Sequence, residues 1–337
     1  MAKDKFQKKH DSDTQQVPSA GDAEERALTS EEIDRQLAAI GLSSPETVSD
    51  DEPLASPIGY VRKHGGLPAT KKSLGQNWLM DGNAAHEMVY RFGAKKGDLV
   101  VEVGPGAGAL TEHLLRTGAE VIAVEIDRRM VDVLEERWGY EPRLRVVHAN
   151  IMETDLADIT QGRKFRLIGN LPYNITSSLL FALMDHAREH PGTMERLMVM
   201  LQLEVARRAA AEPGDSVYGQ LAVFLRLWGI PEIVMTVPRE LFTPAPKVDA
   251  GVIQMDVAEL PLAPVPHYPT FRRLVKGAFA KRRKMLRNSV PSIPHLAFDE
   301  TIEFDWTRRP QTLTTAEYAE LSTLLIPKRE RDGHDEG

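Results

Sequence analysis

Hydrophobic residues along the chain alternate between short continuous runs and longer segments in which they recur every three or four positions. Short runs bounded by turn residues predict buried strands, and the longer periodic segments predict amphipathic helices. Strands that alternate with helices predict an α/β fold built on a parallel sheet. We expect strands at 99–103, 120–124, 144–148, 165–168, 197–201, 230–237 and 248–257, and helices at 83–92, 109–116, 128–138, 176–188, 204–210 and 218–228.

The pattern changes toward both ends of the chain. The first 57 residues are rich in Asp, Glu, Ser, Gln and Pro, and only Ile33, Leu37, Ile40 and Leu42 have the spacing of one short amphipathic helix. Such a composition favours a disordered arm.

A proline-rich stretch from Leu260 to Pro269 predicts a domain boundary. After it the pattern is helical, with segments at 271–287, 298–304 and 315–325. We therefore predict an acidic disordered arm at 1–57, a catalytic α/β domain at 58–259, a small all-helical domain at 260–327 and a disordered tail at 328–337.

Composition narrows the class of protein. The apolar fraction of 42% suffices for a buried core, and no run of some 18 apolar residues could span a membrane. The N-terminus has no apolar stretch typical of a secretory signal, and the chain has no cysteine. The ten histidines form no His-Glu-x-x-His pattern. We therefore expect a soluble cytoplasmic monomer that binds no membrane and no metal.

Charge is distributed unevenly. The first 57 residues hold six Lys/Arg and thirteen Asp/Glu, so the rest of the chain carries 36 of each sign. Within the neutral remainder, residues 271–287 contain eight basic residues and no acidic one. Such a cluster is a candidate face for phosphate contacts, although a solvated helix face would have the same composition. The eight are Arg272, Arg273, Lys276, Lys281, Arg282, Arg283, Lys284 and Arg287.

The chain is organised around residues 168–174, Ile-Gly-Asn-Leu-Pro-Tyr-Asn, which follow the predicted strand at 165–168. Ligands of open α/β sheets bind outside such strand ends. The amide of Asn170, the proline and the aromatic ring of Tyr173 suit a pocket for a flat, hydrogen-bonding base. A proline turn that caps the following helix would explain the same residues.

A glycine-rich turn, Gly104-Pro105-Gly106-Ala107-Gly108, follows the strand at 99–103 and precedes a helix. Glycines in this position let the backbone approach a ligand closely. The spacing differs from the dinucleotide fingerprint G-x-G-x-x-G and, behind Glu102, resembles the first motif of S-adenosylmethionine methyltransferases. A plain tight turn is the alternative.

The next two predicted strands each end in a polar side chain. Glu125 could accept the hydroxyls of a ribose, while Asp127 is better placed to cap the following helix. Asn150 could bind the edge of an adenine, or cap a turn.

A loop with three prolines surrounds Phe242. Because prolines stiffen a loop, we predict that it holds this ring outward for stacking on a base. Packing of Phe242 on the sheet edge is the alternative.

Together these residues resemble the small-subunit ribosomal RNA adenine dimethyltransferase family over residues 71–325. Several motifs in the same order carry the resemblance: Ser73-Leu74-Gly75-Gln76-Asn77-Trp78-Leu79, Glu102-Val103-Gly104-Pro105-Gly106-Ala107-Gly108, Asn170-Leu171-Pro172-Tyr173-Asn174, Phe242-Thr243-Pro244-Ala245-Pro246-Lys247-Val248-Asp249 and Ala278-Phe279-Ala280-Lys281-Arg282-Arg283-Lys284.

The resemblance implies a Rossmann-like class I methyltransferase sheet with a small all-helical C-terminal domain. It implies S-adenosyl-L-methionine as methyl donor, S-adenosyl-L-homocysteine as product and no metal. The implied cofactor contacts are Asn77, Leu79, Gly104, Gly106, Glu125, Asn150 and Asn170. The family usually has Asp where this chain has Asn150, so we expect an effect on affinity and none on the reaction. Trp78 stands in place of the usual Phe.

The implied reaction is dimethylation of the N6 amine of two adjacent adenosines in the 3′-terminal hairpin loop of 16S rRNA, in the immature small ribosomal subunit. In our mechanistic hypothesis, the Asn170 side-chain oxygen and the Leu171 carbonyl accept the amine's hydrogens beside Pro172, and Tyr173 and Phe242 sandwich the flipped base. Two alternatives stay open. One is a resistance-type 23S rRNA dimethyltransferase, and the other is a non-catalytic assembly factor on the same fold.

Overall fold

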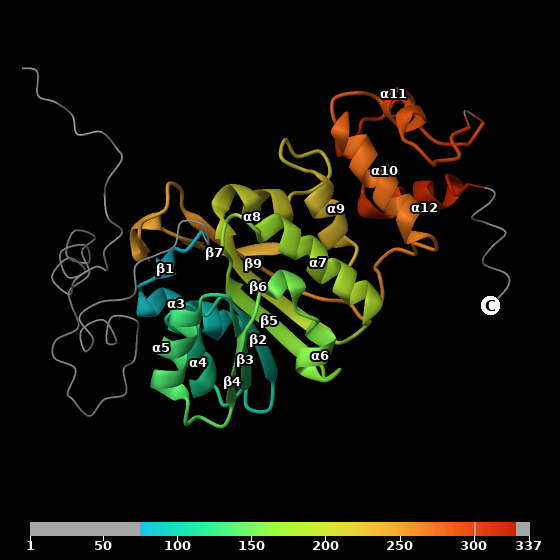
Figure 1. Cartoon of the computed structure of the whole chain (residues 1–337). Coiled ribbons are helices and arrows are strands. Elements are labelled where there is room, and N and C mark those ends of the chain that lie inside the picture. Colours follow the sequence, from blue (N-terminus) through green and yellow to red (C-terminus); the bar gives the residue numbers. More distant parts are fainter. Residues whose placement is uncertain (1–74, 300, 328–337) are drawn as a thin grey trace, which may run out of the picture.

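The computed structural model describes residues 75–299 and 301–327 (Figure 1). The predicted acidic arm, its short amphipathic helix, the motif residues before Gly75 and the C-terminal tail lie outside these residues.

A seven-stranded mixed sheet forms the centre of the fold, in the order β4-β3-β2-β5-β6-β9-β7. The first five strands in this order run parallel, whereas β9 lies antiparallel to both β6 and β7. The strands are β2 (Leu99–Val103), β3 (Glu120–Glu125), β4 (Leu144–His148), β5 (Phe165–Asn170), β6 (Met194–Gln202), β7 (Glu232–Val237) and β9 (Ala250–Asp256). The predicted α/β fold is confirmed.

Helices cover both faces of the sheet (Figure 1). Successive side chains of a strand point to opposite faces. In β2, accordingly, Val100 packs in one apolar cluster with α3 and α4, while Val101 packs in a larger cluster with α7 and α9. The helices of the sheet region are α3 (Gly82–Phe92), α4 (Ala109–Arg116), α5 (Arg128–Trp138), α6 (Leu156–Thr160), α7 (Thr176–Glu189), α8 (Leu203–Ala210) and α9 (Gln220–Arg226), with a 3-10 turn η2 at Ile151–Glu153.

The order of the strands locates the ligand crevice. The chain proceeds from β2 to β3 and β4 on one side and then returns to place β5 on the other side of β2. Ligands of open α/β sheets bind outside the carboxyl ends of the strands at such a switch point. Val103 pairs with Gly169 there. A Cβ atom on Gly169 would lie 2.5 Å from the Val103 carbonyl oxygen, so only glycine allows this approach.

A second, two-stranded sheet lies next to the crevice. It pairs β1 (Trp78–Leu79) with β8 (Phe242–Thr243) in antiparallel register, and Leu79 lies opposite Phe242. The segment before α3 is thereby joined to the loop between β7 and β9, and Met80 donates its amide to the Leu241 carbonyl at 2.9 Å.

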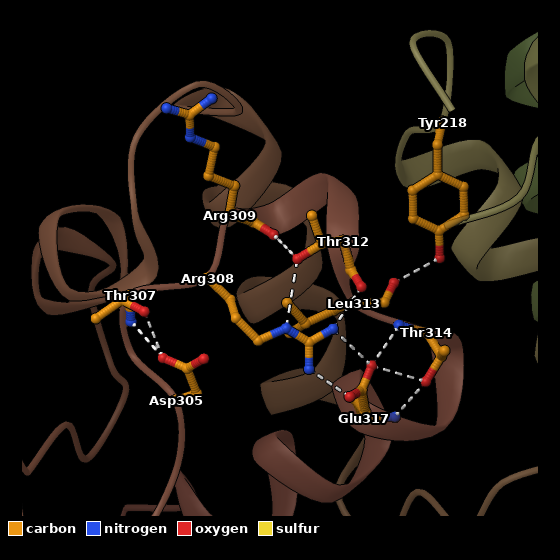
Figure 2. A network of polar contacts seen from close by, with 9 residues as sticks. All are labelled: Tyr218, Asp305, Thr307, Arg308, Arg309, Thr312, Leu313, Thr314 and Glu317. Carbon is orange, nitrogen blue, oxygen red and sulfur yellow. Dashed lines mark hydrogen bonds and ion pairs between the residues drawn. The ribbon is translucent and has the colours of Figure 1, made fainter. Parts of the chain in front are cut away.

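The C-terminal helices are α10 (Tyr268–Ala280), α11 (Leu286–Ser289) and α12 (Thr315–Leu324). Their buried residues, including Phe271 and Tyr318, belong to the same apolar cluster as Phe224 of α9. Tyr218 also donates its hydroxyl to the Leu313 carbonyl at 3.0 Å (Figure 2). The division at residue 260 stays a prediction.

The helix predicted at 271–287 is confirmed only as far as Ala280, and the helix predicted at 298–304 is wrong. Residues 281–285 form a turn, because the amides of Leu286 and Arg287 bond to the carbonyls of Arg308 and Trp306 instead of continuing α10. No helix forms among the described residues of 298–304. There Trp306 packs against Phe298 and Phe304, with ring centroids 4.9 and 5.4 Å apart.

Candidate active site

A cavity of about 300 Å³ opens at the carboxyl ends of β2, β3 and β5. Small-molecule sites usually measure about 300–1,000 Å³. It brings together most of the predicted cofactor and base contacts, which lie up to about 100 positions apart in the sequence. Its lining includes Gly75, Gln76, Asn77, Trp78, Gly104, Gly106, Glu125, Ile126, Asn150, Ile151, Met152, Asn170, Leu171, Pro172 and Tyr173.

The glycine turn forms the floor between β2 and α4. Gly104 and Gly106 have φ angles of 66° and 54°, which side chains rarely adopt. A Cβ on Gly106 would also lie 3.2 Å from the Trp78 ring, and the Gly106 amide donates to Glu125 at 3.1 Å. The turn therefore brings bare backbone to the cavity wall.

Glu125 ends β3 and is 4% exposed. Burial raises the pKa of its carboxyl, and hydrogen bonds from the Asp127 and Gly106 amides oppose the shift. Each carboxylate oxygen accepts one amide, at 2.8 Å from Asp127 and 3.1 Å from Gly106. A carboxylate offers about four acceptor positions, so two are left for hydroxyl groups.

The predicted capping role of Asp127 is confirmed. Its side chain accepts the Arg129 amide at the start of α5, and Gln76 donates to it at 3.0 Å. These bonds lower the pKa of Asp127 against the opposing effect of its burial. The loop before β1 is thereby attached to the end of β3.

Glu102 of β2 is 1% exposed, and burial raises the pKa of its carboxyl to about 8. Thr111 donates to one of its oxygens at 2.7 Å, while the other has no partner among the described residues. Burial thus favours the protonated form of Glu102. Its partner Thr111 was not predicted, since only the fold brings α4 over this carboxyl.

Asn170 at the end of β5 contributes an oriented amide to the cavity. Its amide nitrogen donates to the Asn77 carbonyl at 3.1 Å, which leaves the side-chain oxygen as an acceptor. Leu171, the next residue, donates its own amide to the Met200 carbonyl. Pro172 follows and accepts the Thr176 hydroxyl at the start of α7 at 3.0 Å. The motif is therefore held from both sides.

Tyr173 lies at the cavity with its ring half-buried. Burial raises the pKa of its hydroxyl, and the charge of Asp249 adds to the shift. The hydroxyl is buried and has no hydrogen-bond partner among the residues that the structure describes. The part of Tyr173 available to a ligand is thus its aromatic surface.

The prediction that the proline loop holds Phe242 outward is wrong. Phe242 is 2% exposed and does not line the cavity. Its pairing with Leu79 places it in an apolar cluster with Val237 and Ala250. Burial of the whole ring outweighs the stiffness of the loop, which corresponds to the alternative of packing at the sheet edge.

Leu79 does not line the main cavity, because β1 directs its side chain into the same apolar cluster as Phe242, where it is 3% exposed. It does line a smaller cavity together with Gly104, Gly106 and Asn170, so its cofactor contact stays a prediction. Asn150 lines the cavity and also caps η2, with its oxygen accepting the Met152 amide at 3.1 Å. Both interpretations of Asn150 therefore have structural support.

Seven of the eight basic residues of 271–287 divide between two concave surfaces toward opposite ends of α10. Arg272, Arg273 and Lys276 share one with Asp185, Arg188 and Glu189. The other, here called the distal basic surface, includes Lys281, Arg282, Arg283, Lys284 and Arg309. Arg287 is exposed and lines neither. Local sequence gave no signal for Arg309 or Arg188, which the fold adds to these surfaces.

Figure 2 shows what holds Arg309 in place. Its neighbour Arg308 pairs with Glu317 of α12, and Glu317 forms a capping box with Thr314. Thr312 donates its hydroxyl to the Arg309 carbonyl at 2.9 Å. The Arg309 side chain points away from this network (Figure 2), so its guanidinium is available to a partner.

Solved structures share this architecture. The 23S rRNA methyltransferase ErmE is 26% identical, with a TM-score of 0.53 over 72% of this chain and all of that one. A dimethyladenosine transferase from Plasmodium falciparum has the same fold, with a TM-score of 0.59 over 72% of this chain and 95% of that one, at 24% identity. The sheet, the glycine turn and the cavity define a class I methyltransferase that uses S-adenosyl-L-methionine.

Sequence relatives narrow the class to one family. The profile of the Ribosomal RNA adenine dimethylase family matches residues 68–325. Ribosomal RNA small subunit methyltransferase A of Myxococcus xanthus is 40% identical, over 81% of this chain and 96% of that relative. The protein of the same name from Alkaliphilus oremlandii is 35% identical, over 76% and 92%. The chain belongs to the ribosomal RNA adenine dimethylase family and has ribosomal RNA as its partner.

Two further predictions concern membrane-spanning helices and metal sites. Residues 75–299 and 301–327 include no helix long and apolar enough to cross a membrane. In the same residues, His, Cys, Asp and Glu form no group of three that could hold a metal ion.

Proposed function

We propose that this protein dimethylates the N6 amine of two adjacent adenosines in the 3′-terminal hairpin loop of 16S rRNA, late in assembly of the small ribosomal subunit. The names of the relatives that are 34–40% identical support the small subunit as the target. The observation that carries the proposal is the Asn170 amide, oriented by Asn77 beside the glycine turn in one cavity.

S-adenosyl-L-methionine, when bound, supplies an electrophilic methyl group. The cavity fits such a group. Ile126, Ile151 and Met152 offer apolar surface for a purine, and the glycine turn leaves room for the backbone to approach. Glu125 keeps two acceptor positions for ribose hydroxyls. The residues that would hold the cofactor are Asn77, Leu79, Gly104, Gly106, Glu125, Asn150 and Asn170.

The protein's own groups orient the amine that reacts. The exocyclic amine of adenine is a weak nucleophile because its lone pair is delocalised into the ring. The Asn170 side-chain oxygen and the Leu171 carbonyl accept its hydrogens and hold the nitrogen toward tetrahedral geometry. Orientation of this kind can contribute roughly 7–11 kcal/mol. No carboxylate base is needed, since the amine becomes acidic once methylated.

Tyr173 supplies the stacking surface for the flipped base. Stacking of a base on an aromatic ring contributes about 1–3 kcal/mol, which offsets the few kcal/mol that unstacking costs. With Phe242 buried, the base stacks on one ring of this pair and not on two. Pro172 completes the loop between the amide and the ring.

RNA binding extends over the helical region. We propose that the distal basic surface, with Arg309 added to Lys281, Arg282, Arg283 and Lys284, contacts RNA phosphates, as do Arg272, Arg273, Lys276 and Arg287. Structured RNA is recognised mainly by shape and backbone contacts. The proposal includes a domain boundary near residue 260, action as a monomer and a cytoplasmic location, where immature subunits occur.

The test is methyl transfer from labelled S-adenosyl-L-methionine to small subunits that lack the modification, with large subunits as the control. Digestion of the RNA should yield N6,N6-dimethyladenosine, and primer extension should stop at two adjacent adenosines near the 3′ end of 16S rRNA. Label in large-subunit RNA would favour the resistance-type activity. Binding to small subunits without transfer would favour an assembly factor.

A further inference from the structure

The side chain of Asn150 is bonded at both of its polar atoms by the short helix that it caps. Its oxygen accepts the Met152 amide at 3.1 Å, and its amide nitrogen donates to Glu153 Oε1 at 2.8 Å. The Asn150 carbonyl also accepts the Thr154 hydroxyl at 2.8 Å. The residue is therefore held in one orientation between the cavity and the helix.

The orientation of a side-chain amide decides which hydrogen-bonding group it presents, whereas both ends of a carboxylate are acceptors. A half-turn of the amide exchanges its acceptor oxygen with its donor nitrogen at almost unchanged shape. A purine with an amino group at position 6 needs an acceptor, and a purine with an oxygen there needs a donor. Asn150 lines the cavity near the apolar Ile126 and Ile151. Its orientation consequently decides which purine the cavity favours.

We propose that Glu153 is a positioning residue that makes the cofactor site selective for adenine. Its carboxylate can accept the Asn150 nitrogen and cannot donate to the Asn150 oxygen, so it reinforces the amide orientation that the Met152 amide also favours. The oxygen keeps one acceptor position besides that used by Met152. Glu153 is exposed and does not line the cavity, so it acts through Asn150. This inference rests on the proposed function, which supplies the adenine.

Two ligands that differ only at the purine test the inference. Calorimetry with the full chain would compare S-adenosyl-L-homocysteine with its deaminated analogue, S-inosyl-L-homocysteine. The wild type should bind the adenine ligand about 10- to 100-fold more tightly, because the mismatched polar group of the other ligand loses its hydrogen bond to Asn150. In Glu153→Ala only the Met152 amide still opposes a turn of the Asn150 amide, so the preference should fall by about 3- to 10-fold. In Glu153→Gln the side-chain amide can accept from the Asn150 nitrogen or donate to the Asn150 oxygen, so the preference should fall in this variant too.

A double variant separates the orienting effect of Glu153 on Asn150 from a general effect on folding. A carboxylate at position 150 cannot present a donor, so Asn150→Asp combined with Glu153→Ala should restore the preference for adenine. Glu232→Ala is the matched control, because Glu232 is an exposed residue of β7 at the opposite edge of the sheet from β4.

An unchanged ligand preference in Glu153→Ala would overturn the inference. Equal weakening of both ligands would also overturn it, because that result indicates a purely structural role. If the wild type bound neither ligand, the proposed function itself would fail, which is a different result from loss of selectivity in one variant.

Discussion

The cavity at the strand ends and the distal basic surface differ in how their polar groups are held. At the cavity, Glu125 and Asn170 are bonded to the backbone of neighbouring segments. At the basic surface, the side chains of Arg283 and Lys284 are exposed and form no hydrogen bond or ion pair with any described residue. Single substitutions at the cavity should therefore have large effects that salt changes little. At the basic surface they should be small, additive and salt-dependent.

The largest effect on stability should come from substitution of Phe242, which is buried in the core beside the cavity. Phe242→Ala should lower the free energy of unfolding by about 3–5 kcal/mol, because it removes a buried ring. Tyr140→Ala is the matched control. Tyr140 is 78% exposed, and its loss should cost less than about 0.5 kcal/mol. Urea denaturation measures both, and a Phe242 variant as stable as wild type would contradict the burial.

Substitution of Tyr173 should affect methyl transfer, whereas substitution of Phe242 affects stability. Tyr173→Ala should lower kcat/KM for methyl transfer by about 5- to 150-fold, since one stacked base contributes about 1–3 kcal/mol. Tyr173→Phe should keep near-normal turnover, because the lost hydroxyl has no hydrogen-bond partner among the described residues. Steady-state kinetics with small subunits would measure both, and an inactive Phe variant would show that the hydroxyl contributes to the reaction.

Glu102 should make stability depend on pH. Its pKa is about 8 in the folded protein and about 4.5 in the unfolded chain, so folding retains a proton between these values. The stabilising contribution is complete below pH 4.5 and is lost as the pH rises toward 8. The side chain of Gln in Glu102→Gln cannot ionise. The free energy of unfolding of this variant should therefore rise relative to that of the wild type by at most about 1.4 kcal/mol per pH unit over this interval. Urea denaturation at pH 5, 6.5 and 8 measures the difference, and a difference independent of pH would contradict the assignment.

The smallest effects should occur at the distal basic surface. Arg283→Ala, Lys284→Ala and Arg309→Ala should each weaken binding to small-subunit RNA by a few-fold and reduce the slope of log affinity against log salt by about 1. Filter binding at several salt concentrations measures this. Arg282→Ala should differ by also lowering stability, because its guanidinium bonds to the Asp215 and Ser216 carbonyls. Salt slopes equal to that of wild type would exclude these residues from the RNA contact.

The sequence predicted the path of the chain better than the fate of individual side chains. Strand and helix positions followed from the apolar pattern, and β2, α4, α5 and β4 begin and end where predicted. The motifs also gave the glycine turn and the loop after β5, because backbone conformation there is encoded locally.

Phe242, Leu79 and Arg309 show what local sequence could not provide. The first two are buried by the pairing of β1 with β8, which joins segments about 160 positions apart. Arg309 reaches the basic surface through the pairing of Arg308 with α12. Each outcome depends on tertiary contacts between distant segments, so no periodicity or motif within one segment predicts it.

The most direct test of the central claim is methyl transfer by Asn170→Ala to unmodified small subunits, measured beside RNA binding. Asn83→Ala, which removes an exposed amide on α3, is the matched control. We predict that Asn170→Ala lowers kcat by about 10²–10³-fold, comparable to the loss of one preorganised polar group, with RNA affinity within about 3-fold of wild type. Near-normal turnover in Asn170→Ala would contradict the claim that this amide orients the adenine amine.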